Sequence, residues 1–193
     1  MAVLSLAPAI RRTVAAIALI AATASGVRAE PVRSLDDALA ATFPGARIES
    51  RTLVLSLVDQ DRVSKRARAR CESRLVTAYV AWHGDTLAGA AYTDRRLVRT
   101  REALLFIAVS PDTSIARIEV LAFFEPPDYR PAPRWLALFA RRKLDAKLAP
   151  GGAVPNLSGA TLTAHTVAES ARLALAWHEL LLAPQLAARK EQR

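Results

Sequence analysis

The sequence predicts an α+β fold, with an antiparallel sheet flanked by helices, in a single domain that follows a signal peptide. Several strand-like runs follow one another through the middle of the chain with short connections between them. Strands joined by short loops pair in antiparallel fashion. Segments with helical spacing of apolar residues precede and follow these runs, so they can cover a face of the sheet. The length of 193 residues is sufficient for one hydrophobic core.

The first 29 residues have the pattern of a signal peptide. Arg11 and Arg12 form a positive region, and the apolar run Val14–Ala24 follows them. This run is shorter than the ~20 residues that span a bilayer. A small residue at Ala29 completes a cleavage site, so we expect a mature chain that begins at Glu30 in a periplasmic compartment. Retention of the segment as an N-terminal anchor is the less favoured alternative.

The remaining elements are delimited by capping and turn residues. Ser34 can cap a first helix that Pro44 stops, and Ser56 with Asp59 forms an acidic variant of the capping box. Ser110–Ser114 has the composition of a hairpin loop. The predicted elements are a helix over 35–43, a strand over 47–55, a helix over 56–70, strands over 75–82, 86–92, 102–109 and 115–124, and helices over 133–148 and 164–182.

The chain leaves the last strand through a proline-rich loop. Pro126 and Pro127 cannot continue a strand, and we expect them to project Glu125, Asp128 and Tyr129 from an ordered loop. The helix that follows is predicted to bury three side chains at helical spacing, Trp135, Leu138 and Phe139.

Composition argues against several classes of function. Removing residues 1–29, which contain three arginines and no acidic residue, lowers the net charge from +9 to +6. The basic clusters at 62–74 and 141–147 are typical of solvated helix faces, and no nucleic-acid-binding motif accompanies them. The single cysteine, Cys71, and the three scattered histidines have no metal-ligand spacing. We therefore expect no nucleic acid and no metal among the ligands.

The stretch Pro155–Thr163 is predicted to be a turn that leads into a long helix. Gly159 supplies backbone freedom, Ala160 leaves the surroundings of Thr161 uncrowded, and Thr163 is the expected N-cap. A helix N-terminus offers unpaired N–H groups and a positive dipole end, which suit a phosphate. A threonine hydroxyl beside that end could form a phosphate ester.

At these residues the chain resembles the FMN-binding domain proteins, which include the C subunit of the sodium-pumping NADH:quinone reductase and the G subunit of the Rnf complex. Their motif reads Asp-x-x-Ser/Thr-Gly-Ala-Thr, and its last threonine carries FMN through a phosphodiester. Ser158, Gly159, Ala160 and Thr161 match the last four positions, and the acidic position falls on Pro155. The motif covers 157–163, and the order of elements is similar over about 75–180.

The resemblance implies an exported flavoprotein that acts as an electron-transfer relay. FMN would be attached to Thr161 by a periplasmic flavin transferase, and a membrane redox partner would exchange electrons with it. The FMN-binding domain would be 30–193, with a core at about 75–182. The residues expected near the cofactor are Ser158, Gly159, Ala160, Thr161, Leu162, Thr163, Glu125 and Tyr129, with Pro126 beside them.

Two other classes of function remain open at this point. One is a non-redox periplasmic module of the same fold that binds a ligand or a protein, which the proline at 155 favours. The other is a hydrolase with Ser158 or Ser170 as nucleophile. The chain contains no Gly-x-Ser-x-Gly sequence and no evident His–Asp arrangement, so this class is the least favoured.

Overall fold

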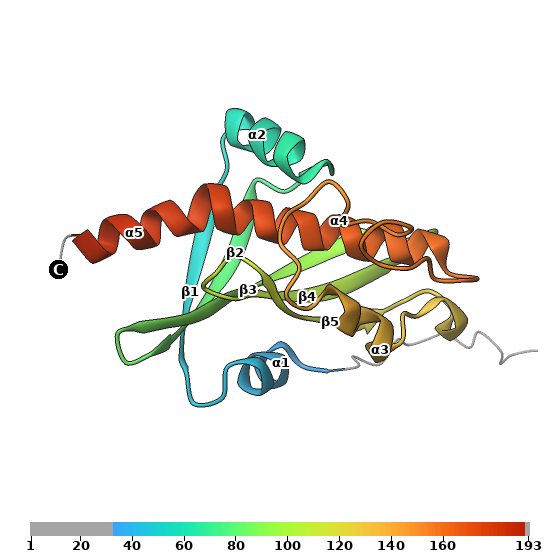
Figure 1. Cartoon of the computed structure of the whole chain (residues 1–193), viewed down its shortest axis with the longest axis horizontal. Coiled ribbons are helices and arrows are strands. Elements are labelled where there is room, and N and C mark those ends of the chain that lie inside the picture. The colour runs from blue at the N-terminus through green and yellow to red at the C-terminus, as the bar shows by residue number, and fades with distance from the viewer. Residues whose placement is uncertain (1–32, 192–193) are drawn as a thin grey trace, which may run out of the picture.

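The computed structural model describes residues 33–191, and its elements follow the predicted order (Figure 1). The predicted signal peptide at 1–29 lies outside the described residues. Within 33–191, no helix combines the length and apolarity that a membrane span requires. The helices and strands are α1 Leu35–Thr42, β1 Arg47–Val54, α2 Leu57–Ala67, β2 Leu75–His83, β3 Thr86–Leu97, β4 Glu102–Val109, β5 Ile115–Phe123, α3 Pro133–Leu136, α4 Thr161–Trp177 and α5 Ala183–Glu191.

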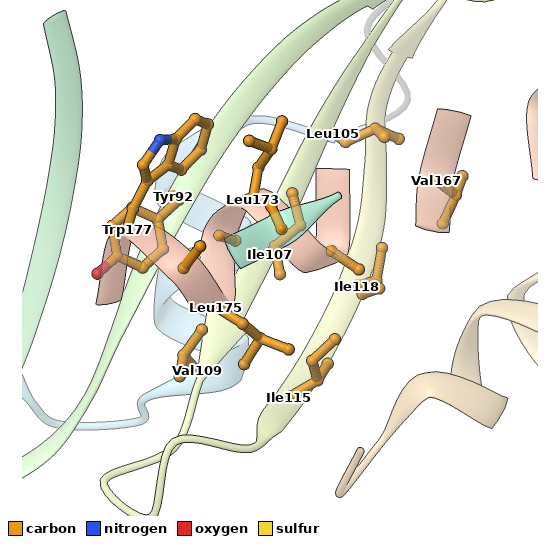
Figure 2. Packing of buried hydrophobic residues seen from close by; sticks show 14 of the residues in the cluster. Tyr92, Leu105, Ile107, Val109, Ile115, Ile118, Val167, Leu173, Leu175 and Trp177 are labelled. Atoms are coloured by element: carbon orange, nitrogen blue, oxygen red, sulfur yellow. The ribbon is translucent and has the colours of Figure 1, made fainter. Parts of the chain in front are cut away.

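The five strands form one antiparallel sheet in the order β1-β2-β3-β4-β5, which confirms the predicted α+β architecture. One face packs against α4 and the other against α1, while α2 packs against α4 (Figure 1). Figure 2 shows Tyr92 and Ile107 from the strands together with Val167 and Trp177 of α4 in the larger core. Full burial of an aliphatic side chain such as Ile107 or Val167 stabilises the fold by about 1.5–3 kcal/mol.

Local signals explain where the first two helices begin. The Ser34 hydroxyl accepts a hydrogen bond from the Asp37 N–H, so it caps α1 as predicted. At α2, Ser56 and Asp59 form the reciprocal capping box. This helix ends three residues earlier than predicted, because Arg68 adopts a left-handed conformation with φ 49° that terminates the helical pattern.

The predicted helix over 133–148 is wrong beyond residue 139. After α3 the chain makes one 3₁₀ turn, Ala137–Phe139, and Arg141 then adopts φ 64°. The segment that follows pairs with the start of β5. The Arg141 N–H donates to the Ile115 carbonyl at 2.7 Å, and the Ile115 N–H donates to the Arg142 carbonyl at 2.8 Å. Leu138 lies in the 3₁₀ turn and is 42% exposed, so the prediction that it is buried is wrong.

The C-terminal helix is longer than predicted and is interrupted by a wide turn. After α4 comes the π-helical turn His178–Leu182, and α5 continues the same direction to Glu191 (Figure 1). Pro184, a residue that a regular helix interior does not tolerate, lies in the first turn of α5. Proline has no N–H to donate and clashes with the carbonyl four residues earlier in a regular α-helix, so a locally widened turn accommodates it.

His178 in this wide turn is buried in the core. Its Nδ1 atom lies 3.2 Å from the hydroxyl oxygen of Tyr92, and its ring is edge-on to that of Tyr92. Burial lowers the pKa of His178 to about 4, and burial also raises the pKa of Tyr92. The folded protein therefore keeps His178 neutral at pH values where an unfolded chain would protonate it.

We predict that His178→Asn will reduce the loss of unfolding free energy that occurs as the pH falls below neutral. The unfolded chain binds a proton at His178 near pH 6.5 and the folded chain only near pH 4, so stability is lost as the pH falls between these values. The loss reaches about 3 kcal/mol, since each pKa unit is worth about 1.4 kcal/mol. Urea unfolding at pH 7, 5.5 and 4 measures it. The matched control is His83→Asn at the exposed end of β2, and an equal reduction of the acid-side loss in both variants would contradict the assignment to His178.

Candidate functional site

A surface cavity of about 300 Å³ lies at the N-terminus of α4, and we call it the α4 cavity. It is formed where the turn before α4 approaches the β3–β4 hairpin loop and the loop after β5. Segments that are far apart in the sequence therefore share its walls. The residues that line it are Val98, Arg99, Glu125, Tyr129, Gly159, Ala160, Thr161, Leu162 and Thr163.

One wall is the turn that the sequence singled out. Gly159 has φ 78°, a conformation that favours glycine, and the Ala160 N–H closes the turn by donating to the Leu157 carbonyl at 3.0 Å. The helix begins at Thr161 with Ala160 as its N-cap. The prediction of Thr163 as N-cap is therefore wrong by one turn. Thr163 is the third helical residue and is 2% exposed.

The helix end presents donors and a hydroxyl to the cavity. No side chain caps α4 at Ala160, so the first N–H groups of the helix are available to a ligand. Thr161 and Leu162 are exposed at this end. Ser158 is also exposed in the turn, but it does not line the cavity. Thr161 therefore combines an accessible hydroxyl with the helix N–H groups, and Ser158 does not.

The opposite wall is organised by Glu125. This residue is 4% exposed instead of projecting from the loop, and its Oε1 atom accepts hydrogen bonds from three successive backbone N–H groups. The distances are 3.0 Å to Arg99, 2.6 Å to Thr100 and 2.8 Å to Arg101. The backbone N–H groups of Thr100 and then Arg101 contribute most to lowering the pKa of Glu125. The Glu125 carboxylate therefore fixes the β3–β4 hairpin loop. Its role in the cavity wall is to support this loop.

The loop that Glu125 fixes carries Arg99 at the cavity. The guanidinium lies over the ring of Tyr129, 5.8 Å from its centroid, and Nη1 donates to the Tyr129 hydroxyl at 3.4 Å. Arg99 is exposed, so its charge remains available to an anion. Sequence reasoning missed Val98 and Arg99. Their only local signal was the position of a basic loop between two strands, which does not say what that loop approaches.

The turn is also attached to the core behind it. The Trp135 indole N–H donates to the Pro155 carbonyl at 2.9 Å, and the Trp135 ring is edge-on to Phe139 at 5.2 Å. Pro155 occupies the position where the resembling family has an acidic residue. Its backbone here holds the start of the turn against α3.

The other candidate functional groups do not line the α4 cavity. Ser170 is 0% exposed, so it cannot meet a substrate as a nucleophile. Cys71 is buried, and its Sγ accepts from the Trp177 indole N–H at 3.4 Å. Among residues 33–191, no group of three His, Cys, Asp or Glu side chains is arranged to hold a metal ion.

In comparisons with known proteins, no protein-family model and no curated protein sequence matches the chain.

We predict that Glu125→Ala will release the hairpin loop. Without the carboxylate, the N–H groups of Arg99, Thr100 and Arg101 lose their acceptor, and their hydrogen exchange should accelerate about tenfold or more. Glu125→Gln retains an acceptor oxygen and should restore part of the protection.

Amide exchange measured by NMR from pH 7 to pH 3 tests this prediction. The pKa of Glu125 is lowered, so its protection is present above the ordinary glutamate pKa and is lost as the pH falls through the lowered value. Asp128→Ala, an exposed acidic residue in the same loop, is the control. Unchanged exchange in Glu125→Ala would show that another group holds the loop.

Proposed function

We propose that this protein is an exported FMN-binding flavoprotein related to the FMN-binding domain proteins. In this proposal FMN is attached to Thr161 by a phosphodiester and serves as an electron-transfer relay. The observation that carries the proposal is the α4 cavity, in which Glu125 and Tyr129 line the same space as Gly159–Thr163. The family resemblance pointed to Glu125 and Tyr129 and, separately, to the turn at 158–163. It gave no information on how far these residues lie from one another.

The phosphate end of FMN fits the chemistry of the cavity. The N–H groups at the start of α4 and the Arg99 guanidinium are the donors that phosphate oxygens require, and Thr161 presents its hydroxyl beside them. A phosphodiester joins the Thr161 oxygen to the FMN phosphorus, with the net loss of one water. Thr161 is then an attachment residue.

The flavin end finds apolar and aromatic groups on the same cavity. Val98, Leu162 and the Tyr129 ring are the surfaces on which a planar ring can lie. Bound FMN would supply the electron-transfer chemistry, and the protein would orient it. At about 300 Å³ the cavity is at the small end of the range for small-molecule sites, so part of the cofactor would remain accessible to a redox partner.

The expected location follows from the same proposal. An export signal at 1–29 would deliver Thr161 to the periplasm, where a flavin transferase could modify it and a membrane redox partner could reach it. A covalent link would also prevent the loss of a small soluble cofactor outside the cytoplasm.

We predict that Thr161 alone among the hydroxyls of the turn becomes flavinylated. The full chain is coexpressed with a periplasmic flavin transferase, and the denatured protein is examined for fluorescence on a gel under ultraviolet light. Wild type and Ser158→Ala should give a fluorescent band, and Thr161→Ala should give none. The intact mass of wild type should rise by that of FMN less one water.

The same experiment separates the alternatives. A dark wild-type band with flavin absorbance in the native protein contradicts the covalent link and retains the binding site. A dark band without flavin absorbance contradicts the flavoprotein and favours the non-redox binding module. Thr161 is exposed, so Thr161→Ala should change the free energy of unfolding by no more than about 0.5 kcal/mol. A matched thermal melt checks this.

A further inference from the structure

The outer edge of β1 is a regular strand edge at one end of the sheet. β1 comes first in the strand order, and within residues 33–191 no strand pairs with its outer side (Figure 1). In this part of the chain, β2 is also the only element that packs extensively against β1. The β1–β2 ladder runs from Arg47 to Val54 without a register shift. The backbone of such an edge can pair with another strand.

The opposite edge of the sheet is built differently. The β4–β5 ladder contains two register shifts, and the segment after α3 covers the start of β5 through the hydrogen bonds of Ile115 with Arg141 and Arg142. Bulges and covering segments prevent a strand edge from pairing with another molecule. The β1–β2 ladder has no bulge, and 46–54 contains no proline, glycine or lysine.

The register of β1 against β2 determines which backbone groups face outward. The Leu55 N–H donates to the Arg74 carbonyl at 2.8 Å, so these two positions form a hydrogen-bonded pair. Alternation along the antiparallel ladder then directs the backbone groups of the odd-numbered residues in 47–53 toward β2. The even-numbered residues direct their N–H and C=O groups outward. They are Ile48, Ser50, Thr52 and Val54.

The side chains of β1 alternate between the two faces of the sheet. Leu53 belongs to the larger core that α4 covers, and Ile48 packs against the smaller core on the α1 side. The odd-numbered side chains of β1 therefore lie on the α4 side. Arg47, Glu49 and Arg51 form a row of alternating charge on this side.

Within this row, two arginines share one carboxylate. Glu49 is ion-paired with Arg47 and, at 3.4 Å, with Arg51. On β2 the register partners of Glu49 and Arg51 are Val80 and Ala78, so β2 places no charged side chain opposite them. A guanidinium carries several N–H donors, so Arg51 can bind a second carboxylate and keep the first. A strand added at the outer edge is in a position to supply it.

A second copy of β1 supplies this carboxylate in one antiparallel register. A two-fold axis through Ser50 places Glu49 of each copy opposite Arg51 of the other. These are non-hydrogen-bonded pairs, in which the facing side chains approach most closely. An axis through residue 49 would instead place the two glutamates opposite each other, and an axis through residue 51 the two arginines. Both of these registers oppose like charges, which is destabilising.

The same axis pairs the outward backbone groups along the whole strand. Ser50 then lies opposite itself and Ile48 opposite Thr52, and all of these residues direct their N–H and C=O groups outward. Val54, which is 72% exposed, lies opposite Ala46. An axis through Ile48 would place Thr52 and Val54 beyond the start of the second β1. Charge and backbone pairing therefore select the same register.

We propose that the protein forms a symmetric dimer in which the β1 edges of two copies pair in antiparallel fashion about Ser50. One sheet then runs through both copies, and Glu49 and Arg51 of the two copies alternate across the axis. The interface is isologous, as in most two-fold homodimers. No residue of β1 lines the α4 cavity, so the proposal is independent of flavin binding.

Sedimentation equilibrium of the full chain tests the association. The average mass should approach twice that of the monomer as the concentration rises to about 500 µM, because a small interface of two strand edges predicts a Kd in the micromolar range. A chain that remains monomeric up to about 1 mM overturns the proposal.

Hydrogen exchange locates the interface. The amides of Ser50 and Thr52 should exchange at least about tenfold more slowly in the dimer than in the monomer. The amides of Glu49 and Arg51, which point toward β2, should be protected in both. If Ser50 and Thr52 are already protected in the monomer, another segment covers the edge, and the proposal is overturned.

A proline at the axis tests the backbone pairing. Ser50→Pro removes the central N–H donor, and an edge strand tolerates proline where the N–H faces outward. This variant should weaken dimerisation about tenfold or more, whereas Ser50→Ala keeps the N–H and should dimerise like wild type. Equal dimerisation of the two variants contradicts pairing through this edge. Circular dichroism of both variants checks that the fold is retained.

A pair of charge reversals tests the register. Glu49→Arg alone opposes two arginines, and Arg51→Glu alone opposes two glutamates, so each should dimerise about tenfold more weakly or worse. An equimolar mixture of the two variants restores opposite charges at both pairs and should associate at least as tightly as wild type. Glu102→Arg and Arg95→Glu make the same charge changes in an exposed ion pair between β3 and β4, and each should leave dimerisation unchanged. Equal weakening in these controls, or no restoration in the mixture, overturns the register.

Discussion

The buried guanidinium of Arg172 fixes the position of α4, on which the rest of the structure depends. Arg172 is 9% exposed, and it donates to the carbonyls of Ala67 and Leu148 at 2.7 Å each and of Arg68 at 3.4 Å. Burial lowers the pKa of Arg172, but an arginine stays protonated, so these acceptors must compensate its desolvation. The carbonyls at the end of α2 have no helical partner, and a cation satisfies them. One side chain thereby joins α2, α4 and the segment before the turn.

The position of α4 in turn decides where the functional residues lie. Thr161 is 11 residues before Arg172, or about 16 Å along the helix axis, so fixing the helix at Arg172 also fixes its N-terminus. The facing wall is held separately by Glu125, whose carboxylate occupies three backbone N–H groups as a bound anion would. Both walls of the α4 cavity are therefore held by buried charged groups, which is the form of preorganisation that a binding site needs.

Sequence reasoning succeeded where the signal is local. Ser34, the pair Ser56 and Asp59, and the alternating strands each specify their element within a few residues, so the order of elements was predictable. It failed where the local structure depends on contacts with residues that are distant in the sequence. The helix expected to 148 ends because its continuation pairs with β5, and Arg99 reaches the cavity because Glu125 holds its loop. Neither partner is close in sequence, so no periodicity or capping pattern could have indicated these contacts.

The sheet is split between β2 and β3 beyond Ala78 and Tyr92, where the two strands stop pairing, and the way the β3–β4 hairpin is held explains this split. Beyond Tyr92 the hairpin has lost β2 as a neighbour, yet Arg96 holds its flank by donating to Asp94, to Glu169 of α4 and to the Arg70 carbonyl. Glu125 holds its tip. These contacts hold the hairpin against α4, the segment between α2 and β2, and the β5 exit, and none of them is made to β2 itself. The open strand edges are thus the consequence of the same contacts that carry Arg99 to the N-terminus of α4.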